Sequence, residues 1–567
     1  MKNQTPKTLT RFWSLLKKDR KEIRNIYIFA VLSGILSLGL PLGIQSIINF
    51  IQLGQLSASW MVLVGLVVLA IGFAGILNIY QMRITENLQQ KIFTRSAFEF
   101  ADRLPKINMS ELLERYAPEL TNRFFDTLTI QKGLSKLLLD FTAASLQVVF
   151  GLILLSMYHS FFIILGVFLV GLLVVIIRYT ANRGFVSSME ESKSKYKIAN
   201  WLLEIAHARV SFKMAGHNRL HVNKTDKYLN EYLNAREKHF KVLVQQYSFL
   251  IAFKVIIALT LLLVGGLLVL NQQMNIGQFV ASEIIILLVL SSVEKIILSI
   301  DIVYDVITAI EKVGEVTDLK LETTGGRHPN FENENGFRIK LNNISYQPHC
   351  YIAPILTNVS INIQSNEIVS VISDSSVSPN TLFSLIGGLY ETDEGSLSVN
   401  DLPITNIDKI SLRDSIGTIL QQDKLIHASL FENISFGREK VSINNIMAVA
   451  KQVGLDRDLE IFKSGFDTMI NPEGHFIPEE VIQKILLVRA IVHQPKLLLI
   501  ENPTDRMKEK CIQSFIEIIQ SLKNCTILLS TSDEEILKKS NRIICIKNGQ
   551  IDFEGDYSAY INTKKSC

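Results

Sequence analysis

The sequence predicts an α-helical domain that crosses a membrane six times, followed by an α/β domain of the nucleotide-binding type. Three observations support this fold class. Hydrophobic residues make up 48% of the 567 residues, more than in an ordinary soluble domain. Six apolar stretches before residue 301 are each long enough to cross a bilayer, which requires roughly 20 residues. From about residue 337, short β-rich runs alternate with helical ones.

Alternating short and long gaps separate the six predicted spans, which cover 25–51, 60–82, 133–156, 161–180, 246–270 and 276–300. The short gaps contain no Lys or Arg, whereas the long gaps at about 83–132 and 181–245 are rich in both. Because basic loops stay on the cytosolic side, we expect a multi-pass protein of the inner (cell) membrane with a cytosolic C-terminal domain. Buried helices of a soluble protein fit less well, because such helices rarely reach this length.

The segment before the first span, TRFWSLLKKDRKEIRNIY (10–27), mixes aromatic and aliphatic residues with basic ones. Two interpretations remain open: an amphipathic helix on the cytosolic face of the membrane, or a cytosolic extension of the first span. The segment 1–24 is assigned to the cytosol in either case. We expect no cleavable signal, because no small-residue cleavage site follows the first apolar run.

Two stretches of the long loops, 108–128 and 190–216, are candidate contact elements for the C-terminal domain. The second contains apolar residues at helical spacing, with Trp201 beside them. Trp201 is therefore a coupling candidate, although helices that pack against one another explain most of these stretches equally well.

Charged residues within predicted spans are costly and are often functional. Lys254 lies in the fifth predicted span, and Glu283, Glu294 and Lys295 lie in the sixth. Counted outward from the turn between these spans, Lys254 and Glu294 reach similar depths. They either pair with each other or extend separately toward the cytosolic interface. Glu283 has no such partner and is the better candidate for lining a polar cavity.

The remaining composition excludes several classes of function. The net charge is only +4, and no basic tail or interleaved aromatic and basic residues indicate a nucleic-acid partner. The five cysteines form no C-x-x-C motif and the histidines do not cluster, so we expect neither a metal site nor disulfides. These cysteines are Cys350, Cys511, Cys525, Cys545 and Cys567.

The stretch 371–390 has the strand–loop–helix pattern of a phosphate-binding loop, G-x-x-x-x-G-K-[ST], without its key residues. Together with six spans, it resembles a half-transporter of the ATP-binding cassette (ABC) exporter family. The membrane half looks most like the type I secretion class, which exports peptides and proteins, without the N-terminal peptidase domain that some members carry. The resemblance implies a membrane domain at 25–320, a linker at 321–336 and a cassette at 337–567.

Aligned on the family, three serines occupy the glycine positions of the phosphate-binding loop: Ser373, Ser376 and Ser378. Pro379 stands in place of the lysine that reaches the phosphates, and Asn380 in place of the Mg²⁺-ligating hydroxyl, while Thr381 is retained. In the Walker B strand, Glu501 replaces the Asp and Asn502 replaces the general-base Glu. The family implies that these positions lack the phosphate anchor, the metal ligand and the base.

The positions of the signature, the switch histidine and the adenine-stacking aromatic also lack the residues that the family uses to bind or hydrolyse nucleotide. The signature segment corresponds to Ile477-Pro478-Glu479-Glu480-Val481, and Ser532 stands at the switch histidine. Pro348 stands at the aromatic that stacks on adenine, although Tyr346 is close by. The loss of two charge-assisted contacts, roughly 1.5–3 kcal/mol each, weakens binding by roughly 10²–10⁴-fold. We therefore expect weak or absent ATP and Mg²⁺ binding, and no catalytic residue.

The positions that resemble the family without change are structural. Gln421 matches the Q-loop, which contacts the membrane domain's loops, and ASLFENISFG with Arg489-Ala490 also matches. Apolar strand and helix patterns are intact throughout. The loss is confined to positions that touch nucleotide or water, which indicates a cassette retained for a role other than hydrolysis.

Three hypotheses follow. The first is an exporter-type half-transporter that forms a homodimer or heterodimer and moves a peptide, protein or lipid-like substrate, with a periplasmic adaptor as a further partner. The second is a membrane scaffold or receptor of the same fold that organises partner proteins without transport. The third is a working ATPase with an unusual site.

Overall fold

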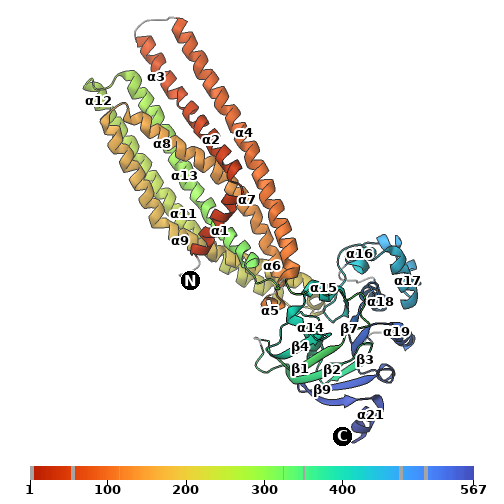
Figure 1. Cartoon of the computed structure of the whole chain (residues 1–567). Coiled ribbons are helices and arrows are strands. Elements are labelled where there is room, and N and C mark those ends of the chain that lie inside the picture. Colours follow the sequence, from red (N-terminus) through yellow and green to blue (C-terminus); the bar gives the residue numbers. More distant parts are fainter. Residues whose placement is uncertain are drawn as a thin grey trace. The chain divides into compact units, whose positions relative to one another are not determined.

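The computed structural model describes residues 5–52, 58–113, 115, 117–323, 325–348, 351–471, 477–503 and 509–566 (Figure 1). The chain divides into two compact units. The helical unit comprises Met1–Lys106 and Tyr116–Leu319, and the α/β unit comprises Ile107–Arg115 and Lys320–Cys567. Each unit has its own hydrophobic core.

Long helices make up the helical unit, and two π-helical turns interrupt them. The helices are α1 (Thr5–Lys18), α2 (Arg20–Ser37), α3 (Gly39–Gln52), α4 (Ala58–Arg103), α6 (Ala117–Asn122), α7 (Asp126–Lys136), α8 (Thr142–Ser156), α9 (Ser160–His207), α10 (Arg209–Met214), α11 (Leu220–Thr260), α12 (Gly266–Leu270) and α13 (Ile276–Thr317). The π-helical turns are η3 (Leu137–Phe141) and η4 (Leu261–Gly265), and the 3₁₀ turns of this unit are η1 (Leu104–Lys106) and η2 (Arg123–Phe125).

Within the described residues, five helical segments are long and apolar enough to cross a membrane, and they coincide with the first five predicted spans. They are Arg20–Gln52, Ala58–Lys106, Glu119–Ser156, Ser160–His207 and Leu220–Leu270. The sixth predicted span, 276–300, lies in α13, which is not among these five. Its crossing of the membrane remains a prediction. Many of its side chains are buried, because α13 packs against α3, α7, α8, α9 and α11.

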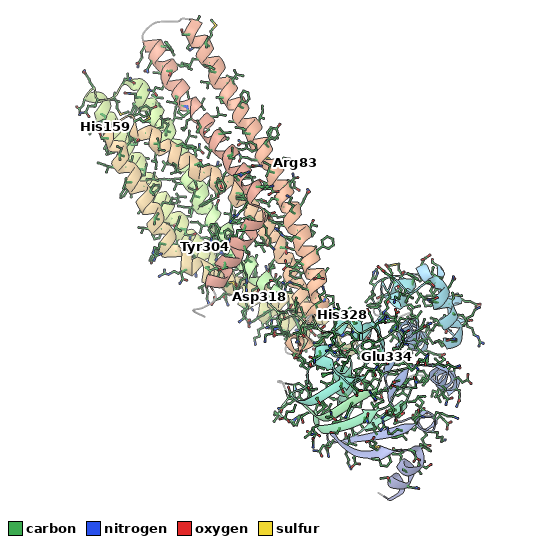
Figure 2. All side chains as sticks on the ribbon, viewed as in Figure 1. Arg83, His159, Tyr304, Asp318, His328 and Glu334 are labelled. Atoms are coloured by element: carbon green, nitrogen blue, oxygen red, sulfur yellow. The ribbon has the colours of Figure 1, made fainter. Side chains whose placement is uncertain are left out.

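The second and third short gaps between predicted spans lie at one end of the helical unit (Figure 1), and most of the first falls outside the described residues. His159, in the turn between α8 and α9, is at this end, and Asp318, just after α13, is at the other (Figure 2). The α12–α13 turn lies at the same end as His159 (Figure 1). The alternation of short and long loops predicted from the sequence is therefore present in the fold.

The segment before the first span forms a helix of its own. The chain bends at Asp19 (φ −118°, ψ 34°), which separates α1 from α2. Phe12, Leu15 and Leu16 pack against the core of the helical unit, whereas Trp13 is exposed. This geometry favours a separate amphipathic helix over a continuous extension of the first span.

Close helix contacts against α13 depend on glycine. A Cβ atom on Gly133 of α7 would lie 2.3 Å from the Val306 side chain, and one on Gly184 of α9 would lie 2.3 Å from the Tyr304 ring. Small residues let helix backbones approach in this way. α7 and α9 therefore pack tightly against the cytosolic half predicted for α13.

The α/β unit contains a four-stranded antiparallel sheet and a six-stranded sheet. The strands are β1 (Ile339–Tyr346), β2 (Leu356–Ile363), β3 (Ile368–Ser373), β4 (Glu394–Val399), β5 (Leu402–Pro403), β6 (Ile416–Ile419), β7 (Leu497–Glu501), β8 (Thr526–Ser530), β9 (Arg542–Lys547) and β10 (Gln550–Gly555). The strand orders are β2-β1-β4-β5 and β10-β9-β3-β8-β7-β6. The second sheet is parallel except for the β9–β10 pair.

Helices surround these sheets, and one short helix comes from the first long loop. They are α5 (Met109–Leu112), α14 (Val377–Ile386), α15 (Lys409–Asp414), α16 (Leu430–Ser435), α17 (Ile443–Val453), α18 (Glu479–Ile491), α19 (Glu509–Ser521), α20 (Glu534–Leu537) and α21 (Tyr557–Ser566). Residue Ile107, just before α5, forms an isolated bridge with Leu321, and the Asn108 amide donates to the Lys320 carbonyl oxygen at 2.9 Å. These bonds attach the 107–115 segment to this unit.

Strand register places the candidate residues together. β8 lies between β3 and β7, and Ser530 is paired with both Val371 of β3 and Glu501 of β7. All three strands are parallel, so they end at the same edge of the sheet. Ligands of open α/β sheets bind at this carboxyl edge.

Candidate functional site

The carboxyl edge of β3, β8 and β7 surrounds a small pocket of about 160 Å³. Five of the sequence-predicted positions line it, namely Ser373, Ser376, Pro379, Asn502 and Ser532. Its lining among the described residues is completed by Val371, Ile372, Ser375, Ser530 and Thr531, and includes no Lys or Arg. The pocket is therefore rich in hydroxyls and offers no cation to a phosphate.

The loop between β3 and α14 satisfies part of its own hydrogen-bonding capacity. The Ser375 amide donates to Ser373 Oγ and the Val377 amide donates to Ser375 Oγ, each at 3.2 Å. The Asp374 carboxylate accepts from the Asn548 amide at 3.2 Å and adds a negative charge to the loop. Phosphate-binding loops work by pointing free amides at the anion. Here the hydroxyls of Ser373 and Ser375 accept hydrogen bonds from two of the loop's backbone amides.

Pro379 and its neighbours lie in the first turn of α14, where the helix N-terminus faces the sheet edge. Pro379 has no amide hydrogen to donate. Ser378, Pro379 and Thr381 are buried. Ser378 and Thr381 therefore belong to the packing of α14 as well as to the predicted site.

Asn380 and Glu501 contact each other directly. Asn380 Nδ2 donates to Glu501 Oε2 at 3.1 Å, and the Gln421 backbone amide donates to the same oxygen at 3.0 Å. Ser384 Oγ donates to Asn380 Oδ1 at 3.3 Å, which fixes the orientation of the amide. In the family pattern, a Mg²⁺ ion is held near these two positions. Here a neutral amide bridges the same elements.

Glu501 is buried, and its second oxygen, Oε1, has no hydrogen-bond partner among the described residues. Burial raises the pKa of this carboxyl above its usual 4.5, although the bonds from Gln421 and Asn380 lower the pKa in part. A group whose pKa is raised by folding contributes most to stability below its unfolded pKa, and this contribution is lost as the pH rises through its folded pKa. Ionised Glu501 is thus a cost to the fold.

We predict that Glu501→Gln stabilises the protein by about 1 kcal/mol, because burying a charge costs more than burying an amide. The gain in melting temperature over the wild type should grow as the pH rises through the raised pKa of Glu501, because the buried carboxyl then ionises. Thermal unfolding at several pH values measures this, with the exposed Glu334→Gln as the control. A variant less stable than the wild type at pH 8 would show that the carboxylate is needed.

Asn502 follows β7 in a left-handed conformation (φ 45°). Its backbone amide donates to the Ser530 carbonyl oxygen at 2.9 Å, and its side-chain oxygen Oδ1 lies 3.5 Å from Ser530 Oγ. An asparagine amide does not accept a proton from water at neutral pH. Asn502, which lines the pocket, thus carries a side chain that is polar but not basic.

A second pocket of about 200 Å³ lies on the other side of α14. Three tyrosines line it, namely Tyr346, Tyr351 and Tyr390, and the rings of Tyr346 and Tyr390 are 5.5 Å apart. Pro348, Asn380, Thr381 and Gln421 line it as well, together with Leu113 from the 107–115 segment. The first predicted contact element and the predicted Q-loop residue therefore share one pocket. The 190–216 segment belongs to the helical unit, and its contact role remains a prediction.

Carboxylates occupy the first turn of α18, where the predicted signature segment lies. Pro478 precedes the helix, and Glu479 and Glu480 are its first two residues. Glu480 Oε1 is 3.5 Å from Lys484 Nζ, which also bonds Asp458 at 2.6 Å. Acidic side chains complement the positive end of a helix. This helix N-terminus therefore carries its own anions.

Trp201 is buried between α9 and α11. Its indole Nε1 donates to Thr225 Oγ1 at 3.1 Å, and Lys224 Nζ lies 4.1 Å from the ring centroid. Phe212 and Tyr228 contact the same ring edge-on. These contacts favour helix packing over coupling as the role of Trp201.

Lys254 and Glu294 form an ion pair between α11 and α13, so of the two interpretations the pair is confirmed. Tyr247 OH donates to the same carboxylate at 3.3 Å. Glu283 is half-buried and has no polar partner among the described residues. Its role in lining a polar cavity stays a prediction.

The sequence did not single out several residues that the fold brings together. Ser375 and Asp374 complete the loop, and Tyr390 completes the tyrosine pocket. Their position beside the phosphate-loop pattern was the available signal. A further polar cluster around His239 gave no motif at all.

Two family models match the chain. The model described as ABC transporter transmembrane region matches residues 23–293, and the model described as ABC transporter matches residues 356–505. The second range includes the β3–α14 loop and Glu501, and the first includes the first five predicted spans.

Curated relatives are similar over part of their length. An uncharacterized ABC transporter ATP-binding protein, YfiB of Bacillus subtilis (strain 168), is 27% identical over 44% of this chain and 44% of its own length. The alpha-hemolysin translocation ATP-binding protein HlyB of Escherichia coli O157:H7 is 23% identical over 53% and 43%. The cyclolysin secretion/processing ATP-binding protein CyaB of Bordetella pertussis is 25% identical over 52% and 41%. The chain thus spans less than half the length of these relatives.

A solved structure of a bacterial Atm1-family ABC exporter with ATP bound has a similar fold, with a TM-score of 0.80 at 16% identity over 96% of each chain. The helical unit and the α/β unit thus occur together in a known exporter architecture. With the two family models in the same order, this chain belongs to the ABC transporter family and has the exporter fold, a transmembrane region followed by an ABC cassette.

Proposed function

We propose that this protein is an exporter-type half-transporter whose cassette does not hydrolyse ATP. It takes part in the export of a peptide, protein or lipid-like substrate across the inner membrane, with the cassette in the cytosol. The protein-secretion relatives support the substrate class, and the basic long loops support the orientation.

The direct contact between Asn380 and Glu501 carries the proposal. A Mg–nucleotide complex needs a hydroxyl, a carboxylate and cationic or amide donors around the phosphates. In this chain the carboxylate is engaged by Asn380 and Gln421, and the pocket lining includes no cation among the described residues. These residues do not fit Mg–nucleotide.

Family members act as dimers, and in the family each nucleotide lies between the phosphate loop of one subunit and the signature of the other. With Pro379 at one half-site and Glu479–Glu480 at the other, this chain supplies neither half. A homodimer would have no complete site, and a heterodimer with an intact partner would have two damaged ones. Without nucleotide between the cassettes, we expect the helical units to carry the association.

Cysteine cross-linking in native membranes tests the dimer and its exchanged loops. We expect the pair Met214→Cys with Ile426→Cys to give dimer-sized products, because the family's second long loop reaches the partner's cassette. Both side chains are exposed, at 82% and 44%. The matched control is Leu113→Cys with Gln421→Cys, which line one pocket of the same chain and should give monomer-sized products. Monomer-sized products from both pairs would contradict the exchanged dimer.

A further inference from the structure

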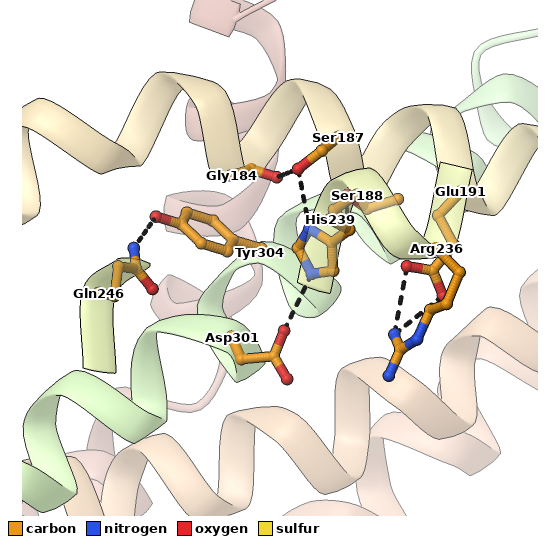
Figure 3. Close-up of polar contacts among 10 residues, drawn as sticks. Gly184, Ser187, Ser188, Glu191, Arg236, His239, Gln246, Asp301 and Tyr304 are labelled. Atoms are coloured by element: carbon orange, nitrogen blue, oxygen red, sulfur yellow. Dashed lines mark hydrogen bonds and ion pairs between the residues drawn. The ribbon is translucent and has the colours of Figure 1, made fainter. Parts of the chain in front are cut away.

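A buried polar cluster joins α9, α11 and α13 of the helical unit (Figure 3). Its centre is His239 of α11, whose side chain is 1% exposed. His239 Nδ1 lies 2.8 Å from Ser187 Oγ on α9, and His239 Nε2 lies 3.1 Å from Asp301 Oδ1 on α13. One imidazole therefore links three helices.

Ser187 has two acceptors for one hydroxyl hydrogen. Its Oγ lies 3.0 Å from the Gly184 carbonyl oxygen and 2.8 Å from His239 Nδ1. The carbonyl oxygen only accepts hydrogen bonds, whereas Nδ1 accepts when it is unprotonated and donates when it is protonated. The direction of the Ser187 hydroxyl is thus tied to the protonation of the histidine.

Two fully hydrogen-bonded states follow from this geometry. In the neutral state, Nε2–H donates to Asp301 and the Ser187 hydroxyl donates to Nδ1. In the cationic state, Nε2–H still donates to Asp301, Nδ1–H donates to Ser187 Oγ, and the hydroxyl turns to the Gly184 carbonyl oxygen. The uptake of one proton from water forms one N–H bond at Nδ1, turns the Ser187 hydroxyl, and makes the Nε2–H bond to Asp301 a charge-assisted one. Neither state leaves a buried polar atom of the imidazole unpaired.

The surrounding charges favour the added proton. The charged and titratable side chains that act on the cluster are Glu191 and Lys195 of α9, Tyr232 and Arg236 of α11, and Asp301, Tyr304 and Asp305 of α13. Arg236 is paired with Glu191 at 3.0 Å, and Lys195 is also 3.7 Å from Asp126. Because these two cations also pair with other carboxylates, they only partly balance the negative charges of Asp301 and Asp305.

Asp301 connects the cluster to the surface of the helical unit, because its side chain is 37% exposed. Asp301 and Asp305 follow the predicted end of the sixth span at residue 300. Burial, and secondarily the charge of Asp301, raises the pKa of Asp305 to about 6. A carboxylate that ionises near neutrality makes the charge of the whole cluster sensitive to pH in the physiological range.

Tight packing surrounds the site. Gly184 lies directly against the Tyr304 ring, and Gln246 Nε2 of α11 donates to Tyr304 OH at 2.9 Å and to Thr180 Oγ1 at 2.7 Å. Charge-assisted hydrogen bonds are about twice as strong as neutral ones. A change in the His239–Asp301 bond therefore acts directly on the contact between α11 and α13.

We propose that His239, held by Ser187 and Asp301, is a proton-binding site of the helical unit, and that proton binding draws α11 toward α13. The ligand is the proton itself. The site goes beyond the proposed export role, and it operates without nucleotide. It gives the helical unit a source of conformational change that does not depend on the cassette.

The first test follows the ring nitrogens of ¹⁵N-labelled histidine in the full chain, in lipid nanodiscs without nucleotide, from about pH 5 to pH 8. The His239 signals are assigned by their loss in His239→Gln. We expect both nitrogens protonated at the acidic end and one at the basic end. Asp301→Asn removes the carboxylate that stabilises the cation, so the transition should move to lower pH by about one unit or more.

The second test measures the distance between α11 and α13 with encoded spin-label residues at Phe240 and Leu298, which are both exposed. We expect a shorter distance at the acidic end in the wild type and in the control His217→Gln, which lies in an exposed loop. In His239→Gln, the distance between the two labels should not change with pH. A His239 ring with constant protonation, or a wild-type distance that ignores pH, overturns the proposal. Neither result bears on ATP hydrolysis, which is measured separately.

Discussion

Purified protein in lipid is expected to hydrolyse ATP no faster than the background. Aligned on the family pattern, Asn502 takes the place of the general base, and an amide does not take the proton of the attacking water. A general base contributes about 10²–10⁴-fold to such a reaction. Pro379 removes both the lysine contact and an amide, so the loss of the base is not compensated by better positioning of the phosphates.

An ATPase assay on the full chain measures this, with the double variant Pro379→Lys, Asn502→Glu beside it. The variant shows whether these two positions account for the loss. A hydrolysis rate in the parent protein that Asn502→Ala abolishes would contradict the prediction, since the activity would then belong to this site and not to a contaminant.

Nucleotide affinity is expected to lie about 10²–10⁴-fold below that of a complete site, from the loss of two charge-assisted contacts of roughly 1.5–3 kcal/mol each. Two backbone amides of the loop are also already hydrogen-bonded without nucleotide, because they donate to the hydroxyls of Ser373 and Ser375. Binding would have to break these bonds and bring phosphate toward Asp374 and the buried Glu501.

A thermal-shift series with Mg-ATP up to several millimolar is the measurement, because a ligand that binds only the folded state raises its melting temperature. We expect no saturable rise for the wild type. The matched variant Pro379→Lys, Asn380→Ser restores the anchor and the hydroxyl, and should show one. A saturable rise in the melting temperature of the wild type would mean that the cassette still binds ATP, and would favour an ATP-sensing role.

Much of the fold could be predicted from the sequence, because the dominant signals are long and periodic. Apolar stretches such as 161–180 and 246–270 predict spans by length alone, and they fall within α9 and α11–α12. The strand–loop–helix pattern around Ser373 predicts the edge of a parallel sheet. The sixth predicted span lies in α13, which packs against several other helices, and its crossing of the membrane stays a prediction.

The contacts that decide the chemistry were beyond sequence reasoning. The Asn380–Glu501 bond joins residues 121 positions apart, on α14 and β7, and depends on side-chain reach across the sheet edge. The His239 cluster joins three helices through single polar residues that, taken singly, look like ordinary solvent-facing positions. Periodicity identifies the face of a helix, but it does not identify which polar residues of two faces meet.

The most direct measurement of the central claim is an experimental structure of the dimer in lipid with millimolar Mg-ATP. The account predicts that Asn380 Nδ2 still donates to Glu501 Oε2 at about the 3.1 Å seen here, that the Ser373–Ser375 loop keeps its own hydrogen bonds, and that no nucleotide is ordered at the 373–381 loop. Ordered ATP in this loop, with Asn380 and Glu501 separated and a metal ion between them, would contradict the account.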